Sequence, residues 1–361
     1  MALAVTAIVL GCLAVTLPHP SAARADVQTA GVDSLRTDWD PAEPGLSPAD
    51  VLGSDFGQLF ATQLNGQVYA QPLVIGNLVI ANTENDWVYG LSASDGHIIW
   101  SRNLGPAWPA STIGCGDLTP NIGSTATSTY DASTGTVYVT TKTNDGSDAQ
   151  HPTWYLHALD ATTGAERTGW PVPIVGTPSN DPFHPFAAVN VNERPGLLLM
   201  GGAVYMAFGS QCDIGKYVGW VAGVDTGTRV VNLWSDESGA SSSESGIWHA
   251  GGGLVSDGPG RIFLTTGNGV TAPDAPGQNP PQQLSQSVVR LDVNGNGAMS
   301  AQDFFSPTDA ATLDLNDADL GSGGPVALPD QYFGTTATPH LLVEMGKDGR
   351  LFLLNRDHLG G

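Results

Sequence analysis

The sequence predicts an all-β fold, a β-propeller built from four-stranded blades. Short apolar and β-branched runs recur along the chain, separated by Gly, Asp, Asn and Pro, while long helical patterns are hard to find. An internal repeat of strand, turn and strand recurs several times as well. Strand-rich units that repeat along a chain pack radially in a propeller, where each sheet leaves only short, protected edges.

The internal repeat consists of a strand, a tight turn closed by glycine, and a second strand near a tryptophan. In its best copy, residues 156–164 read Leu-His-Ala-Leu-Asp-Ala-Thr-Thr-Gly. Each copy follows an apolar hairpin, which supplies the other two strands of a four-stranded unit. The three copies and their tryptophans are 88–96 with Trp100, 156–164 with Trp170, and the degenerate 221–227 with Trp234.

Two more units are expected after these copies, so that about five blades are visible in the chain. The fourth covers 251–291 and the fifth covers 323–354. Because the chain ends soon after a strand of the fifth unit, we expect the ring to be truncated at the C-terminus. In the alternative, residues 50–65 close a smaller ring. The expected domains are an N-terminal extension at 26–65, which contains the ring-closing strand, and the propeller at 66–361.

The strongly acidic composition excludes several classes of partner. Among 361 residues, 13 are Lys or Arg and 35 are Asp or Glu, which gives a net charge of −22. Phosphate recognition needs clustered cations, so nucleic acid is excluded as a partner. Anionic membrane surfaces are disfavoured for the same reason. No segment is apolar for long enough to predict a transmembrane helix.

The first 25 residues are predicted to be a signal peptide. Residues 2–17 are apolar or small and carry no charge, and 23–25 read Ala-Arg-Ala, which fits the small-x-small cleavage rule. We therefore expect cleavage after Ala25 and a secreted mature chain. In a second interpretation Cys12 carries a lipid anchor, but the residues before it fit that motif poorly.

Cleavage would leave two cysteines, Cys115 and Cys212, in the mature chain. An even number of cysteines in an exported protein favours a disulfide, and both lie in glycine-rich, loop-like surroundings. The alternative is two separate buried thiols.

One segment has the spacing of a calcium-binding loop. Residues 292–303 place oxygen ligands at the positions of an EF-hand-type loop, with glycine at the sixth position for the sharp turn. The preceding residues read as a strand rather than a helix, so the alternative is a simple hairpin turn between two propeller strands. The candidate calcium ligands are Asp292, Asn294, Asn296, Ala298 through its carbonyl, Ser300 and Asp303.

The repeat resembles that of enzymes that use pyrroloquinoline quinone (PQQ), and the whole mature chain resembles exported bacterial PQQ-like propeller proteins. The resemblance covers nearly all of residues 30–361 and is specific for the fold rather than for an activity. The segments that carry it, besides 156–164, are 36–40, 67–73, 113–120 and 346–350.

The resemblance implies a PQQ site at the centre of the ring. In quinoprotein dehydrogenases the cofactor lies on a tryptophan floor, with a Ca²⁺ ion held by Glu, Asn and Asp and an Asp as the base. Trp248 is the candidate for the floor, and Asp117 and His249 are candidates for acid–base groups. Two observations oppose this interpretation: the adjacent cysteine pair of the alcohol-oxidising members is missing, and a tryptophan in a blade is commonly core packing.

We therefore expect a secreted, non-catalytic propeller that binds a polysaccharide or a protein partner as a display scaffold. The alternative is a PQQ- and Ca²⁺-dependent alcohol or sugar dehydrogenase. A lipid-anchored assembly scaffold is a third hypothesis, which depends on Cys12.

Overall fold

The computed structural model describes residues 26–41, 46–54, 56–269 and 279–361. The predicted signal peptide and Cys12 lie outside these ranges. Within them, none of the helices is long and apolar enough to cross a membrane. The helical segments are short: α1 (Pro48–Val51), α2 (Ala310–Leu315), and the 3₁₀ turns η1 (Ala110–Ile113), η2 (Ala188–Asn190), η3 (His249–Gly251) and η4 (Leu320–Ser322).

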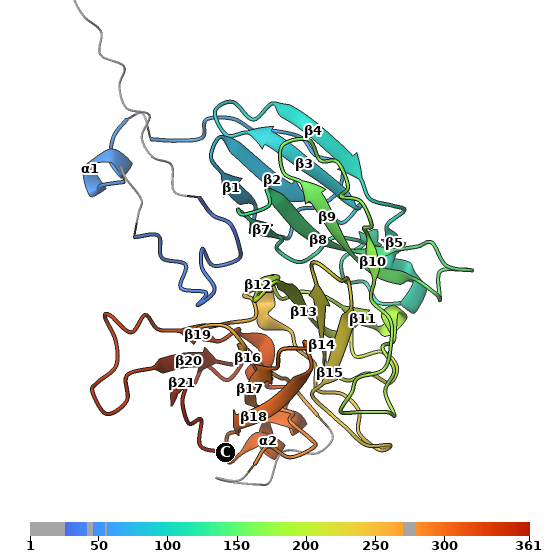
Figure 1. Ribbon diagram of the computed structural model, residues 1–361, viewed down its shortest axis with the longest axis vertical. Coiled ribbons are helices and arrows are strands. Elements are labelled where there is room, and N and C mark those ends of the chain that lie inside the picture. The colour runs from blue at the N-terminus through green and yellow to red at the C-terminus, as the bar shows by residue number, and fades with distance from the viewer. Residues whose placement is uncertain (1–25, 42–45, 55, 270–278) are drawn as a thin grey trace, which may run out of the picture.

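Five antiparallel sheets follow one another along the described chain and are arranged around an arc (Figure 1). This arrangement confirms the predicted all-β propeller. The first blade contains β1 (Leu73–Ile75), β2 (Leu78–Asn82), β3 (Trp87–Ser92) and β4 (Ile98–Asn103). The second contains β7 (Thr129–Asp131), β8 (Thr136–Thr143), β9 (Thr153–Asp160) and β10 (Val172–Pro173).

The third blade contains β12 (Leu198–Met200), β13 (Ala203–Ser210), β14 (Trp220–Asp225) and β15 (Val231–Ser235), and β11 (Val191–Asn192) also pairs with β13. The fourth contains β16 (Arg261–Thr265), β17 (Val288–Val293) and β18 (Met299–Phe305). The fifth contains β19 (Val326–Ala327), β20 (Leu341–Met345) and β21 (Leu351–Asn355). A short ribbon of β5 (Trp108–Pro109) and β6 (Asn121–Ile122) lies between the first two blades in the sequence.

The repeated tryptophan and glycine of the first blade join it to the second. Trp100 on β4 lies opposite Gly90 on β3, where a Cβ atom would lie 2.3 Å from the indole nitrogen. The indole nitrogen donates a 3.0 Å hydrogen bond to the carbonyl of Ala161, at the turn after β9. A Cβ atom on Gly164 in that turn would lie 2.4 Å from the same ring. The tryptophan and glycine of the repeat therefore form a contact between neighbouring blades, in addition to marking the strands.

The N-terminal segment 26–38 contacts all five blades, four of them through backbone hydrogen bonds and the third through the Thr29 and Arg36 side chains, which donate to the Leu197 carbonyl. Val27 pairs with Val74 on β1, with backbone hydrogen bonds of 2.8 and 2.9 Å. The carbonyls of Gln28, Ser34 and Leu35 accept bonds from the second, fourth and fifth blades, through the N–H groups of Tyr130, Ser256 and Ala327. Among the described residues of 50–65 there is no strand, so the pairing with the first blade comes from Val27 instead.

Arg36 fixes this segment at the centre of the arc. Its guanidinium is buried and donates to the carbonyls of Leu197 in the third blade and Leu254 in the fourth, both at 2.9 Å. It also donates to the Ala30 carbonyl at 2.6 Å and to the Thr29 hydroxyl at 2.7 Å. Burial lowers the Arg36 pKa to about 10, against the opposing effect of Asp33 and Asp38, so the side chain stays charged at neutral pH.

Replacing Arg36 with methionine is expected to lower the free energy of unfolding by about 2–4 kcal/mol, because buried carbonyls in two blades lose their donor. Urea unfolding followed by tryptophan fluorescence measures the loss. The matched control is Arg350→Met, which removes ion pairs of a half-exposed arginine with Asp309 and Asp348 and should cost less than about 1 kcal/mol. Equal losses for the two variants would contradict the role of Arg36.

Buried threonine–glutamate hydrogen bonds also cross from blade to blade. Thr125 donates to Glu84 at 3.1 Å, Thr140 to Glu193 at 2.5 Å, and Thr265 to Glu344 at 2.7 Å. Burial raises the pKa of Glu84 to about 7 and that of Glu344 to about 8, although their hydrogen bonds act in the opposite direction. Burial likewise raises the pKa of Glu193 well above its usual range. These carboxyl groups are therefore mainly protonated in the folded protein at mildly acidic pH.

Glu344→Gln is expected to reduce the pH dependence of folding stability. The Glu344 carboxyl binds its proton more tightly in the folded chain, so its contribution is complete below about pH 4.5 and is lost as the pH rises through about 8. Between pH 5 and pH 9 the wild type should therefore lose about 4 kcal/mol more of its free energy of unfolding than the variant does. Urea unfolding at both pH values measures this difference. The exposed Glu244→Gln is the control, and the prediction fails if the two variants change alike.

Candidate functional site

One cavity of about 460 Å³ lies where loops from several blades meet. Its lining comes from the η1–β6 loop, the segment after β11, the β13–β14 loop, the residues before η3, and the loops of the fourth and fifth blades. These parts are far apart in the sequence, and the arrangement of the blades brings them together. The charged lining residues are Asp117, Arg194, Asp213, Glu244, Asp317, Asp319 and Lys347.

Trp248 supplies the largest ring of the lining and lies against glycine backbone. A Cβ atom on Gly209 would lie 2.7 Å from the indole ring, and one on Gly246 or Gly267 would lie 3.1 or 3.0 Å from its nitrogen. Larger residues at these three positions would displace the ring. The indole is half-buried and forms part of the cavity wall, which makes it a surface on which a planar ligand can stack.

The oxygen-rich part of the cavity is built by the fourth and fifth blades. Asn268, which follows β16, donates from its backbone to Asp319 at 2.7 Å and from its side chain to Asp317 at 2.8 Å. The Lys347 ammonium lies 3.0 Å from Asp317 and 2.5 Å from Asp319. Partial burial lowers the pKa of Lys347, but the bonds to these two carboxylates outweigh it and the net shift is upward.

A buried glutamine stands behind this set. The Gln286 amide nitrogen donates to Asn268 Oδ1 at 2.6 Å and to Asp314 Oδ1 at 3.0 Å, and its oxygen accepts from the Leu320 N–H at 2.7 Å. The glutamine therefore links Asn268 of the fourth blade to the loop that carries Asp319. Asp317 and Asp319 offer the carboxylate oxygens that hard cations prefer, and Asn268 Oδ1, which accepts from Gln286, has a second lone pair for a cation. Among the described residues there is no cluster of three or more His, Cys, Asp or Glu side chains suited to a metal, so a metal here would need the amide as well.

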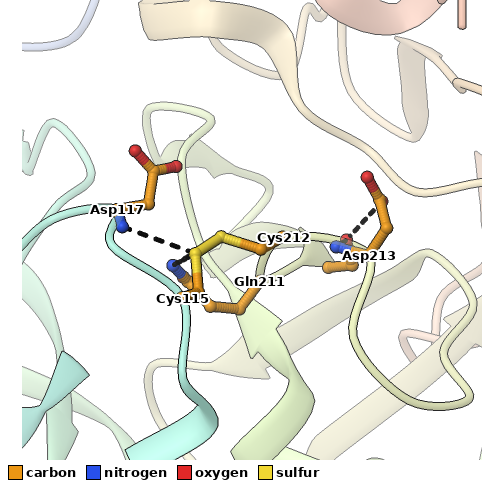
Figure 2. Close-up of a disulfide and its surroundings, with 6 residues drawn as sticks. Cys115, Asp117, Gln211, Cys212 and Asp213 are labelled. Carbon is orange, nitrogen blue, oxygen red and sulfur yellow. Dashed lines mark hydrogen bonds between the residues drawn. A yellow bond between two sulfur atoms is a disulfide. The ribbon is translucent and has the colours of Figure 1, made fainter. Parts of the chain in front are cut away.

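The predicted disulfide between Cys115 and Cys212 is present (Figure 2), and Cys212 lines the cavity. It joins loops 97 residues apart in the sequence, with a Cα–Cα distance of 6.3 Å. The side-chain nitrogen of Gln211 lies 4.0 and 3.8 Å from the two sulfur atoms, and the Asp117 N–H donates to the Cys115 sulfur at 3.4 Å. The disulfide thereby ties the Asp117 loop to the third blade at the edge of the cavity.

Two of the three residues predicted from the PQQ resemblance line this cavity. Trp248 forms part of the wall, and Asp117 lies beside the disulfide (Figure 2). His249 is fully buried instead, where it accepts a 2.9 Å hydrogen bond from the Thr265 N–H. Burial lowers the His249 pKa to about 4, although hydrogen bonding to the backbone opposes the shift. The imidazole is therefore neutral and does not line the cavity.

The candidate calcium loop forms the hairpin between β17 and β18, near the turns at Gly201 and Gly260. Asn294 Oδ1 accepts the N–H groups of Asn296 and Ala298, at 3.1 and 3.0 Å. Asp292 pairs with Ser300 across the strands, and Asp303 accepts from the Leu359 N–H at 2.8 Å. The geometry is that of a closed strand–turn–strand hairpin, and calcium binding by this loop stays a prediction.

Four residues in the oxygen-rich part of the cavity were not predicted from the sequence: Asn268, Asp317, Asp319 and Lys347. One local signal was available, since Asp317 and Asp319 form an acid–x–acid pattern in a glycine-rich segment. Lys347 lies in the segment 346–350, which already carried the resemblance. No pattern in the sequence connects these positions with Asn268.

Fold and cavity together define a β-propeller with PQQ-like blades. The model of the family described as outer membrane protein assembly factor BamB matches residues 53–266. This is more than half of the chain, and the chain belongs to that family. No curated protein matches it.

Several solved structures share the fold. The quinohemoprotein alcohol dehydrogenase of Comamonas testosteroni has 17% identity over 94% of this chain and 49% of its own, with a TM-score of 0.65. The quinohemoprotein alcohol dehydrogenase ADHIIG of Pseudomonas putida HK5 has 16% identity over 93% of this chain and 47% of its own, with a TM-score of 0.63. A europium-containing methanol dehydrogenase has 16% identity over 93% of this chain and 57% of its own, with a TM-score of 0.58. The chain thus spans about half the length of these structures, and at such identities the similarity shows the fold alone.

Replacing both cysteines with serine is expected to lower the free energy of unfolding by about 2–5 kcal/mol, because the unfolded chain loses a long closed loop. Urea unfolding of the double variant against wild type measures the loss. Limited proteolysis should show new cleavage at 110–120, where the loop loses its attachment to the third blade. Unchanged stability and an unchanged cleavage pattern would contradict this role of the disulfide.

Proposed function

We propose that the cavity binds PQQ together with a divalent cation, and that the protein uses them to oxidise an alcohol or a sugar hydroxyl. One observation carries the proposal: a single cavity contains an indole ring, a disulfide edge, an amide with two carboxylates, and two cationic side chains. Each of these groups matches a different part of a planar, anionic quinone and its metal ion.

The lining fits the chemistry of the cofactor. PQQ is a flat, fused-ring quinone with several carboxylates, so it needs an aromatic surface and positive charge. The indole of Trp248 supplies the surface, and Arg194 and Lys347 supply the charge. The cavity volume of about 460 Å³ is in the range of small-molecule sites. The cysteines are not adjacent in the sequence, but their disulfide lies at the same cavity as Trp248.

Asn268, Asp317 and Asp319 would hold the cation, and the two aspartates differ in a way that suggests separate tasks. The Asp319 side chain is only 9% exposed and is fixed by the Asn268 N–H, as suits a metal ligand. The Asp317 side chain is 76% exposed: its Oδ1, which faces Asn268 and Lys347, would contact the cation, and its Oδ2 would accept the hydroxyl proton of a substrate. When bound, the quinone supplies the acceptor for the hydride that leaves the substrate carbon. Trp248 orients the ring, and Lys347 adds positive charge beside it.

A non-catalytic scaffold is the competing proposal. The family description as an assembly factor supports it, as does the missing adjacent cysteine pair. In this case a polysaccharide or another protein is the partner, and calcium at the 292–303 hairpin has a structural role. Export of the mature chain is part of both proposals. The disulfide is compatible with export, since such bonds persist in oxidising compartments.

The deciding experiment is a titration of the protein with PQQ in the presence of Ca²⁺, followed by absorbance and by a dye-linked alcohol oxidation assay. Stoichiometric binding with turnover is expected. Asp317→Asn should lower kcat by about 10²–10⁴-fold while PQQ remains bound, because the proton acceptor is lost. Trp248→Ala should weaken PQQ binding itself.

The control variant is Asp303→Asn, which alters the hairpin and leaves the cavity residues unchanged. Its PQQ affinity and turnover should equal those of wild type. Absence of PQQ binding at high cofactor concentration would overturn the dehydrogenase proposal and favour the scaffold. Binding without turnover of any alcohol or sugar would separate the cofactor site from the proposed reaction.

A further inference from the structure

The Lys347 ammonium lies between the two carboxylates that the proposed cation would need. It is 3.0 Å from Asp317 Oδ1 and 2.5 Å from Asp319 Oδ2. The lysine follows β20, and its backbone N–H donates to the Asp319 carbonyl at 3.0 Å. The root of the side chain is therefore fixed beside the site, while its end fills the space between the carboxylates.

The carboxylates are held from the opposite side by Asn268. Its backbone N–H binds Asp319 Oδ1, and its amide binds Asp317 Oδ1. The pair is thus organised by neutral donors that do not compensate its charge. Of the charged groups that line the cavity in the described chain, Lys347 is the one that forms ion pairs with these two carboxylates.

We infer that Lys347 is a tethered cation that occupies the metal position in the free protein, and that a divalent ion binds only when the ammonium moves out of it. This inference rests on the proposed function of the cavity. Two carboxylates attract a divalent ion more strongly than they attract a single ammonium group. The displaced ammonium stays on its flexible stem beside the cavity, where it adds positive charge for an anionic cofactor.

The side chain is suited to such a movement. Lys347 is 41% exposed, so an ammonium that leaves the carboxylates returns to water, and its hydration offsets part of the two ion pairs that it gives up. Its ammonium lies at the end of a flexible four-carbon stem, whereas arginine ends in a rigid planar guanidinium. Buried Arg36 is the contrast in the same protein, because its guanidinium is held by carbonyls of two blades and cannot leave.

The inference predicts that removing Lys347 strengthens metal binding, whereas a lysine that only supports the site would weaken it or have no effect. The test uses the chelator-treated full chain without PQQ. Tb³⁺, excited through tryptophan, is the direct probe, and Ca²⁺ competes with it. Lys347→Met should bind both ions at least about tenfold more tightly than wild type, because one positive charge within 4 Å is removed.

Three further variants make the result specific. Lys216→Met has the same change in net charge at an exposed lysine outside the cavity lining, so its affinity should equal that of wild type. Asp319→Asn should weaken binding in both the wild-type and the Lys347→Met background. Lys347→Gln repeats the test with a polar side chain, and thermal unfolding of each metal-free variant verifies that it is folded.

The outcomes separate this inference from the proposed function. Equal or weaker binding by Lys347→Met and Lys347→Gln, with Asp319→Asn still harmful, overturns the tethered-cation role and leaves the metal site in place. If Asp319→Asn and Asp317→Asn change nothing in either background, the ion does not bind here, and both the inference and the metal part of the proposed function fail.

Discussion

The architecture depends on how the polar backbone at the centre of the arc is paired. The inner strands of the blades meet there and present N–H and C=O groups that would be costly to bury alone. The backbone of segment 26–38 pairs with such groups in four of the five blades, and Arg36 satisfies carbonyls of the third and fourth blades at once. A charged guanidinium is well suited to this position, because it offers several donors in a fixed fork.

This central segment also lies close to the residue that follows Trp248 of the cavity wall. Arg36 is close enough to His249 to contribute to the low pKa of that imidazole, after the larger effect of burial. Trp248, the residue before His249, packs against Gly209, Gly246 and Gly267 and borders the cavity. The third, fourth and fifth blades then each add loop residues to the wall. The site is consequently a product of blade packing, in which no single blade holds the full set of groups.

Much of the fold could be predicted from the sequence because its signals are local. Short apolar and β-branched runs determine strands, and the turn with its tryptophan, as at Trp100, marks where one blade contacts the next. The Cys115–Cys212 pairing could also be predicted, since the expected cleavage after Ala25 would leave only these two cysteines. The central role of Arg36 could not, because its partners Leu197 and Leu254 are backbone carbonyls far along the chain, and such acceptors leave no trace in the sequence.

The candidate site shows the same division. Trp248 and Asp117 were predicted from a family resemblance, and both line the cavity. Their roles stay predictions. Asn268, Asp317 and Lys347 come from three separate loops and meet only when the fourth and fifth blades pack side by side. The segment 292–303 has a clearer motif in the sequence than Asn268, Asp317 or Lys347 has. Its spacing follows the rules of a calcium loop, yet the same residue types also favour a tight hairpin.

The most direct test of the account is to locate the metal. Crystals of the protein grown with PQQ and Tb³⁺ would be measured for anomalous scattering. The account predicts one strong peak among Asn268, Asp317 and Asp319, Lys347 displaced from the two carboxylates, and planar density against the Trp248 ring. A peak at the 292–303 hairpin alone, with no density beside Trp248, would contradict the central claim and favour a scaffold with a structural calcium ion.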